Sequence, residues 1–259
     1  MHVPVLSIIF MAVSAVVSIG VPIVLFLFFH RKFNAKVLPM LIGIAAFTIF
    51  ALVLESLIHR IVLTKFALRE TPALYILYGI FMAGIFEETA RFLGFNILKK
   101  KYDGIGTGLA YGIGHGGFES VMLAGVTMLV AFAAGIMINM GYIELLTGKL
   151  QGEMLEAVNT QIDSLVSTAP YMFLVSCLER MFAIAIQISL SIMVFYAVYR
   201  RKMLLYPLAI LFHAVIDIPA AAMQVSVLKN VFFVEGLAGV CAVLMVLFAV
   251  FLYKKMETV

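Results

Sequence analysis

Residues 112–120 read GIGHGGFES and lie inside an apolar run that extends from residue 105 to residue 140. A run of this length can cross a bilayer, which takes about 20 residues in a helix. A charged side chain near the centre of such a helix costs about 2.5 to 3.5 kcal/mol on insertion scales, so His115 and Glu119 need a protein or water environment. The stretch therefore predicts a membrane helix that faces a polar interior.

The rest of the chain is similarly apolar. Hydrophobic residues make up 64% of the 259 residues and charged residues 12%, which is far from the composition of soluble domains. We expect an all-α polytopic membrane protein, a single bundle of about seven transmembrane helices. The predicted helices cover residues 3–29, 37–58, 73–98, 105–140, 170–199, 203–222 and 230–253.

No linker rich in proline, glycine or serine divides the chain, so residues 1–259 are expected to form one bundle with its motif-bearing core at 73–222. The one sizeable segment outside the predicted spans is 141–169. Its apolar residues Leu155, Val158, Ile162 and Leu165 recur at helical spacing. This pattern predicts an amphipathic helix on the outer membrane surface, either a lid or a solvated connection with a packed apolar stripe.

The loops predict the orientation, because lysine and arginine near helix ends are retained in the cytoplasm. One side carries eleven such residues: Arg31, Lys32, Lys36, Lys99, Lys100, Lys101, Arg200, Arg201, Lys202, Lys254 and Lys255. The other side carries five: Arg60, Lys65, Arg69, Lys149 and Lys229. We expect a multi-pass cell-membrane protein with its N-terminus outside and its C-terminus in the cytoplasm. The basic charge is assigned to topology and lipid contact, and no nucleic-acid motif is present.

Ionisable residues within the predicted spans mark the candidate site, because they must face protein or water. Those away from the helix ends are Glu87, Glu88, Arg91, His115, Glu119, Glu179, Arg180, His213 and Asp217. Glu179 and Arg180 are interpreted as structural, pairing with another helix. Glu55 lies within one turn of a predicted helix end and is given no role.

Three of these residues share one depth. Glu88, His115 and His213 each lie ten residues from the predicted cytoplasmic end of their helix, at residues 98, 105 and 203. At about 1.5 Å per residue, all three lie about 15 Å deep and can meet.

Residues at i and i+4 share a helix face. His115 with Glu119, and His213 with Asp217, therefore each present an imidazole and a carboxylate to one neighbour. Arg91 follows both Glu87 and Glu88 by about one turn, so it can neutralise one glutamate and leave the other as the active carboxylate. The spacing does not decide which glutamate stays free.

Glycines recur every fourth residue around His115, at 104, 108, 112 and 116. Such a ridge lets helix backbones approach closely in a membrane. The additional Gly106, Gly114 and Gly117 are expected to leave room for water or an extended peptide near His115.

Two histidines, several carboxylates and access to water are the requirements of metal-assisted hydrolysis. Zinc in enzymes usually has three protein ligands and a bound water, and His115, His213 and Glu88 meet that count, although no HExxH signature is present. In a metal-free alternative, Glu87 or Glu88 is the general base, with His213 and Asp217 orienting the substrate carbonyl and stabilising the oxyanion.

The motifs also resemble a known family. FEETAR at 86–91, YGIGH at 111–115 continuing to Glu119, and FHAVID at 212–217 are similar to the three motifs of the CAAX-protease and bacteriocin-processing superfamily of intramembrane proteases. The motifs look closest to its PrsW-like and YhfC-like branches. The two-residue spacing before Arg91, and Tyr111 in place of phenylalanine, both resemble the PrsW-like pattern. The resemblance implies that Glu87 and Glu88 act as base or ligand, His115 and His213 as base partner or ligands, and Asp217 as oxyanion or ligand support.

The leading hypothesis is an intramembrane (metallo)protease, with a divalent metal such as Zn as a possible cofactor. Its partners would be membrane lipid and a membrane-embedded or membrane-associated peptide substrate. Two alternatives remain: a proton- or ion-coupled transporter, since intramembrane carboxylates and histidines also mark ion paths, and a non-catalytic scaffold that grips a partner helix with the glycine ridge.

Overall fold

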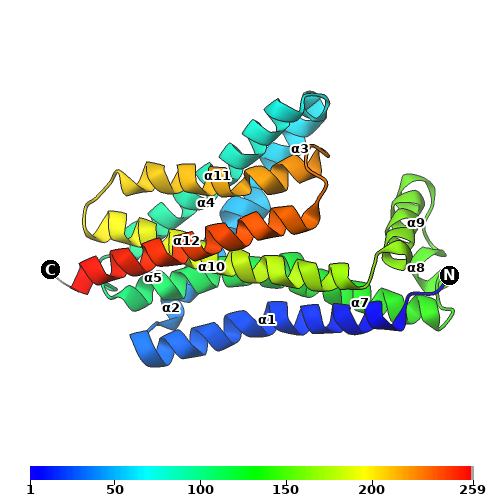
Figure 1. Ribbon diagram of the computed structural model, residues 1–259, viewed down its shortest axis with the longest axis horizontal. Helices are drawn as coiled ribbons and strands as arrows, with labels where there is room; N and C mark the ends of the chain where they lie inside the picture. The colour runs from blue at the N-terminus through cyan, green and yellow to red at the C-terminus, as the bar shows by residue number, and fades with distance from the viewer. Residues whose placement is uncertain (258–259) are drawn as a thin grey trace. The chain divides into compact units, whose positions relative to one another are not determined.

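A computed structural model describes residues 1–257, and helices are the only regular structure in that range (Figure 1). The membrane-length segments are Val5–Phe33, Val37–Lys65, Pro72–Leu98, Ile105–Asn139, Tyr171–Tyr199, Leu205–Gln224 and Val231–Met256. The predicted all-α class with seven membrane-length helices is confirmed. The orientation in the membrane stays a prediction.

Two of these segments change helix type along their length. Val37–Lys65 consists of α2 (Val37–Phe47), a π-helical stretch (Thr48–Glu55) and α3 (Ser56–Lys65). Ile105–Asn139 consists of α5 (Ile105–Gly112), a π-helix (Ile113–Gly117), α6 (Phe118–Ser120), a second π-helix (Val121–Val126) and α7 (Thr127–Asn139). The remaining helices are α1 (Val5–Phe33), a 3₁₀ turn (Leu68–Glu70), α4 (Pro72–Leu98), α8 (Glu144–Thr147), α9 (Gly152–Ser167), α10 (Tyr171–Tyr199), α11 (Leu205–Gln224) and α12 (Val231–Glu257).

The second segment is longer than predicted, because the helix continues through His59 and Arg60 to Lys65. Glu55 was expected near a helix end. It lies instead within the helix and is buried, with 8% of its surface exposed. His59 is the hydrogen-bond partner of Glu55, with its Nε2 3.1 Å from Glu55 Oε1. The Nδ1 of His59 lies 2.9 Å from the Tyr78 hydroxyl on α4. This polar cluster links the second and third segments.

The chain divides into two compact units. The first contains Met1–Val21 and Ser120–Met181. Its core is built by Val3, Met11, Ile138, Ile162 and Phe173. Val158 and Leu165 of α9 pack against this core with Ile162, while Glu153, Glu156 and Asp163 are exposed. Helix α9 thus lies within the segment predicted to be amphipathic, and three of its four apolar stripe residues pack on this core. Its place at the outer membrane surface stays a prediction. Arg180 pairs with its neighbour Glu179 in this unit.

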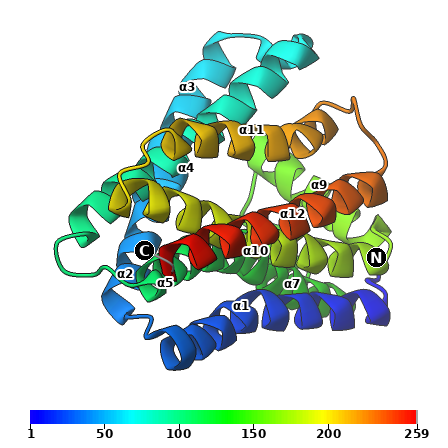
Figure 2. The ribbon, with the colours of Figure 1, turned by 60° about the vertical axis from the view of Figure 1, so that its left-hand side comes forward.

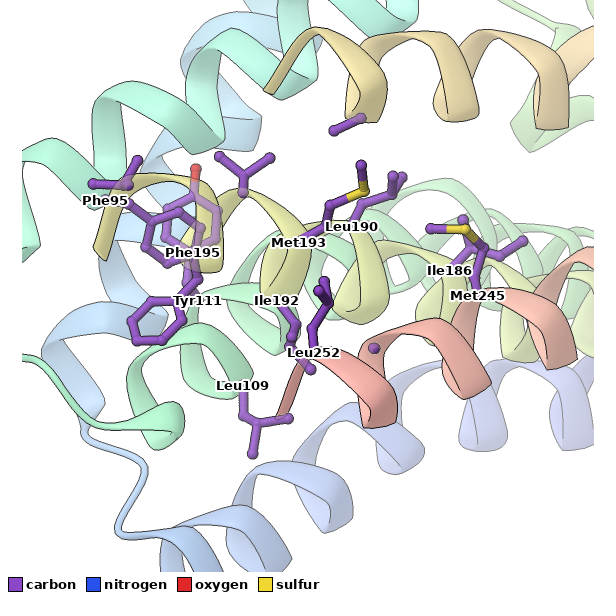
Figure 3. Close-up of a cluster of buried hydrophobic side chains, with 14 of the residues drawn as sticks. Phe95, Leu109, Tyr111, Ile186, Leu190, Ile192, Met193, Phe195, Met245 and Leu252 are labelled. Atoms are coloured by element: carbon purple, nitrogen blue, oxygen red, sulfur yellow. The ribbon is translucent and has the colours of Figure 1, made fainter. Parts of the chain in front are cut away.

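The second unit contains Pro22–Glu119 and Phe182–Val259. Its core centres on α10, which contributes Ile186, Leu190, Met193 and Phe195 to a buried cluster (Figure 3). In its most apolar window α10 is 67% buried, against 22% to 28% for the other membrane-length helices. Most of this window is therefore enclosed by the rest of the chain, and the polar α10 residues Gln187 and Ser191 are buried, with 6% and 0% of their surface exposed.

Two helix pairs place the candidate residues in this unit. Helices α4 and α11 run side by side over much of their length (Figures 1 and 2). Gly84 makes this possible, since an added Cβ there would lie 2.9 Å from the Ile210 carbonyl oxygen. Helix α2 packs against α5 and the π-helix that follows it. Backbone contact at small residues therefore fixes both pairs.

Candidate active site

Side chains from three helical segments converge in the second unit. Helix α4 carries Glu87, Glu88 and Arg91, the π-helix after α5 carries His115, and α11 carries His213. All five are buried: Glu88, Arg91 and His115 have no exposed surface, Glu87 retains 8% and His213 4%. The five side chains therefore lie in the interior of the protein.

Glu87 pairs with His115. Nε2 of His115 lies 2.9 Å from Glu87 Oε2, and the other ring nitrogen, Nδ1, has no hydrogen-bond partner among the described residues. Phe47 covers the ring edge to face at 5.2 Å, and the Tyr111 ring stacks on it at 6.1 Å. The imidazole is therefore held between aromatic rings with one nitrogen directed at the carboxylate.

Glu88 pairs with both Arg91 and His213. Arg91 Nη1 donates to Glu88 Oε1 at 2.5 Å, and His213 Nδ1 lies 2.7 Å from the same oxygen. The other ring nitrogen of His213, Nε2, lies 3.3 Å from Asp217 Oδ2. His213 thus lies between two carboxylates, of which Asp217 is 36% exposed.

The structure decides what the sequence left open about Arg91. Its Nη2 is 3.5 Å from Glu87 Oε2, whereas its Nη1 is 2.5 Å from Glu88. Glu88 is the glutamate that the arginine neutralises at close range, and it is inaccessible. Glu87 is the less tightly paired carboxylate and the one with exposed surface.

Two site residues were missed in the sequence, and both lie on α10. The Gln187 amide accepts a hydrogen bond from Arg91 Nη2 and donates to Glu87 Oε2 at 2.9 Å and to Glu119 Oε2 at 2.7 Å. Ser191 Oγ accepts from Arg91 Nε at 3.2 Å. Neither side chain is charged, so neither carries the insertion cost that singled out the others; the only signal was a polar interruption of an apolar span.

The predicted glycine ridge packs against α10. A Cβ added at Gly112 would lie 2.8 Å from Ile188 Cα, and one at Gly116 would lie 2.4 Å from Gln187 Cβ. Gly108 faces Phe195, while Gly104, at the start of the ridge, meets nothing within 4 Å. The ridge brings His115 and Gln187 together.

The expectation of free space beside His115 was wrong. A Cβ at Gly114 would lie 2.0 Å from the Met40 carbonyl oxygen, one at Gly106 would lie 2.2 Å from the Phe33 oxygen, and one at Gly117 would lie 2.8 Å from Pro22 Cβ. These glycines admit neighbouring backbone and side chain rather than water or peptide, because a close helix contact fills the volume that a missing Cβ releases.

Tyr111 supports the site by packing. Its ring lies 4.6 Å from that of Phe95 and close to Gly94, whose added Cβ would meet the Tyr111 ring at 2.5 Å. Figure 3 shows Tyr111, Phe95 and Phe195 gathered together. The Tyr111 hydroxyl is buried without a hydrogen-bond partner in the described chain.

The donor set has the chemistry of a zinc site, since imidazoles and carboxylates are common zinc ligands. Within residues 1–257, however, no three histidine, cysteine, aspartate or glutamate side chains come together as a metal-binding group. His115 and His213 each contact a different glutamate, and the guanidinium of Arg91 pairs with both carboxylates. In this arrangement His115, His213 and Glu88 do not fit a three-ligand metal site.

Comparison with known proteins gives a consistent result. The sequence model of a family described as YhfC intramembrane metalloprotease matches residues 17–238, which include every candidate residue. The "Uncharacterized membrane protein YhfC" of Bacillus subtilis (strain 168) is 34% identical over 245 residues, which cover 93% of this chain and 94% of the relative. No solved structure matches significantly. The YhfC resemblance is confirmed; that to the wider superfamily and its PrsW-like branch stays a prediction.

Proposed function

Because the chain belongs to the YhfC intramembrane metalloprotease family, we propose that it hydrolyses peptide bonds of membrane-associated substrates with Glu87 as the general base. The pairing pattern of the two glutamates carries this proposal: Arg91 lies 2.5 Å from Glu88 but 3.5 Å from Glu87. One carboxylate is thereby used to hold the arginine, and the other remains available for chemistry. The site would lie in the cytoplasmic half of the bilayer.

Glu87 would act on a water molecule. His115 Nε2 lies 2.9 Å from Glu87 Oε2 and holds that oxygen, which leaves Oε1 to accept a proton from the water. The water oxygen then attacks the carbonyl carbon of the peptide bond, and Glu87 passes the proton to the amine nitrogen as the carbon–nitrogen bond breaks. General acid–base catalysis of this kind contributes about 10² to 10⁴ in rate.

His213 would stabilise the negative charge that develops on the carbonyl oxygen. Its Nδ1 is fixed by Glu88 at 2.7 Å, while Nε2 has only the longer 3.3 Å contact with Asp217. That nitrogen is the donor free to turn toward an oxyanion. Asp217, being partly exposed, marks the side from which substrate reaches the histidine.

Hydrolysis can be detected before the natural substrate is identified. The purified protein, reconstituted in lipid vesicles, is incubated with a pool of synthetic membrane-spanning peptides in ¹⁸O-labelled water. Peptide hydrolysis places ¹⁸O in each new carboxyl terminus, which mass spectrometry locates. We expect labelled termini within the apolar part of some peptides. If cleavage is absent across peptide pools of varied sequence, the proposal fails.

The scaffold alternative requires the glycine ridge to be open to a partner helix. Gly108, Gly112 and Gly116 face Phe195, Ile188 and Gln187 of the same chain, so the ridge does not offer a groove to a partner helix. The transporter alternative predicts a proton or ion flux in the same vesicles that depends on Glu119 or Asp217, and such a flux without peptide cleavage would replace the peptidase.

A further inference from the structure

We propose that the end of α1 predicted to face the cytoplasm binds one anionic phospholipid, with its headgroup on two basic residues and part of an acyl chain in the groove beside them. The inference does not depend on the proposed peptidase activity. The groove has a volume of about 540 Å³, within the range of about 300 to 1,000 Å³ that is usual for ligand pockets. Its lining residues belong to the part of α1 in the second unit: Val24, Leu27, Phe28, Arg31 and Lys32.

The lining is divided by polarity along the helix. Val24, Leu27 and Phe28 share one face, because residues three and four apart are neighbours on a helix. They are 64%, 50% and 48% exposed, so they form an apolar floor that is open to the surroundings. Arg31 follows on the same face, about 10 Å further along the axis than Val24, and Lys32 is next to it in the last turn. A phospholipid has the same division, with a charged headgroup at one end and apolar chains below it.

The two basic side chains have no acidic partner in the described part of the chain. The sequence contains no aspartate or glutamate before Glu55, and neither Arg31 nor Lys32 makes an ion pair with a described carboxylate. Lys32 Nζ lies 5.5 Å from the centre of the Phe28 ring and 5.6 Å from that of Phe33. Aromatic rings attract a cation without neutralising its charge. Both basic groups therefore remain available to an anion.

Neighbouring helices hold this end of α1 in place. The Phe33 carbonyl oxygen would lie 2.2 Å from a Cβ added at Gly106, at the start of α5. The Phe33 ring also contacts the Tyr253 ring of α12 edge to face, at 6.2 Å between centres. The groove is thus formed before a ligand arrives, which lowers the cost of ordering it on binding. Lys254 and Lys255 follow Tyr253 in the last turn of α12 and add positive charge to this end of the unit.

The charge of the groove favours a lipid over a second copy of the chain. In a two-fold dimer the same surface of both copies meets itself. Arg31 and Lys32 of one copy would then lie beside those of the other, and α1 has no acidic residue to separate them. Like charges placed together oppose association, whereas basic residues at a membrane surface attract anionic lipid.

Fluorescence quenching tests this inference, because the chain contains no tryptophan. Phe28→Trp places a single indole in the floor of the groove and keeps an aromatic ring beside Lys32. The full-length protein is reconstituted in phosphatidylcholine vesicles with an increasing fraction of phosphatidylglycerol that carries bromine on its acyl chains, which quenches indole fluorescence on contact. Brominated phosphatidylcholine is the reference lipid. The ratio of the two association constants is the preference for anionic lipid.

Ile97→Trp is the matched reporter outside the groove. Ile97 is 68% exposed at the end of α4 predicted to face the cytoplasm, and the lysines at positions 99 to 101 follow it directly. It therefore experiences at least as much positive charge as Phe28, but it does not line the groove.

We expect the preference for phosphatidylglycerol at Phe28→Trp to exceed that at Ile97→Trp at least about fivefold, the contribution of one basic residue near an anionic surface. Adding Arg31→Gln and Lys32→Gln to Phe28→Trp should lower the preference to the level of the outside reporter. Adding Lys100→Gln and Lys101→Gln instead should leave it unchanged, although it removes the same charge from the same predicted side.

Three results would overturn the inference. Equal preference at the two reporters, or an equal loss with either pair of substitutions, would mean that general surface charge attracts the lipid. Loss of the preference on adding inorganic phosphate at constant ionic strength would mean that the site binds a free anion, which needs no acyl groove. Absence of quenching by both brominated lipids at Phe28→Trp would mean that protein, such as a second copy, covers the groove.

Discussion

Arg91 lies 2.5 Å from Glu88, through Nη1 and Oε1, with both side chains fully buried. The neighbouring Glu87 is 1.0 Å further from the same guanidinium, at 3.5 Å, and contacts His115 instead. Two adjacent glutamates on one helix are thus separated into different environments. This difference is the basis on which we propose Glu87, and not Glu88, as the general base.

Replacing Glu88 with glutamine should destabilise the protein. Removing one partner of a buried ion pair typically costs about 3 to 5 kcal/mol, and Glu88 also accepts from His213. We expect a clearly lower unfolding temperature in detergent for Glu88→Gln than for Glu87→Gln, because Glu87 is the more distant partner of Arg91. Equal stability of the two variants would contradict the assignment of Glu88 as the primary anchor.

Gly116→Ala should destabilise the second unit, since the new methyl group would overlap Gln187 Cβ. Overpacking of this kind typically costs about 1 to 3 kcal/mol. Gly79→Ala on α4 is the matched control, because nothing lies within 4 Å of a Cβ there. The unfolding temperature in detergent measures the stability of both variants. A Gly116→Ala protein as stable as the control would show that the ridge does not pack as described.

Asp217→Asn should slow catalysis with little effect on stability. The Asp217 side chain is 36% exposed, and exposed ion pairs contribute about 0 to 1 kcal/mol. Because Asp217 contacts His213 at 3.3 Å and not the reacting atoms of the proposed mechanism, we expect a fall in kcat of about tenfold, less than the about 10²-fold or greater loss on removing a direct oxyanion donor. Peptide turnover at saturating substrate measures it, and an unchanged kcat would remove Asp217 from the site.

The arrangement around Arg91 also makes a prediction about metal. Since the described His and Glu side chains contact one another and the arginine rather than one common point, protein purified in low-metal buffer should contain far less than one zinc per chain. Elemental analysis of the folded protein measures this. One tightly held zinc per chain would mean that the carboxylates leave Arg91 in the working enzyme, and it would contradict a mechanism in which Glu87 acts without a metal.

The convergence of Glu88, His115 and His213 could be predicted because a charged residue in an apolar span has to face the interior, and depth along a helix is a count of residues. The choice between Glu87 and Glu88 could not, since it depends on the rotation of α4 against its neighbours, and adjacent side chains differ by only about 100°. His115 pairs with Glu87 and His213 with Glu88. These pairs depend on how the helices pack together, which the residue spacing within one helix does not predict.

Other features were beyond the sequence for different reasons. Gln187 carries no charge, so it lacks the insertion cost of a charged side chain that singled out the other site residues. The glycines around His115 signalled close packing correctly for Gly112 and Gly116, but not that Gly114 would be filled by the Met40 carbonyl, because a missing side chain does not identify its neighbour. The second span was expected to end at residue 58, with Arg60 counted as a loop residue. The helix continues instead, and His59 contacts Glu55 and Tyr78.

The most direct test compares peptide hydrolysis by Glu87→Gln and by Glu179→Gln, with ¹⁸O incorporation into new carboxyl termini as the measurement. Both substitutions remove a carboxylate from a membrane-length helix, but Glu179 pairs with Arg180 outside the candidate site. We predict that Glu87→Gln loses at least about 10²-fold in turnover, the contribution of a general base, while Glu179→Gln retains the wild-type rate. Wild-type turnover by a well-folded Glu87→Gln protein would contradict the assignment of Glu87 as the base.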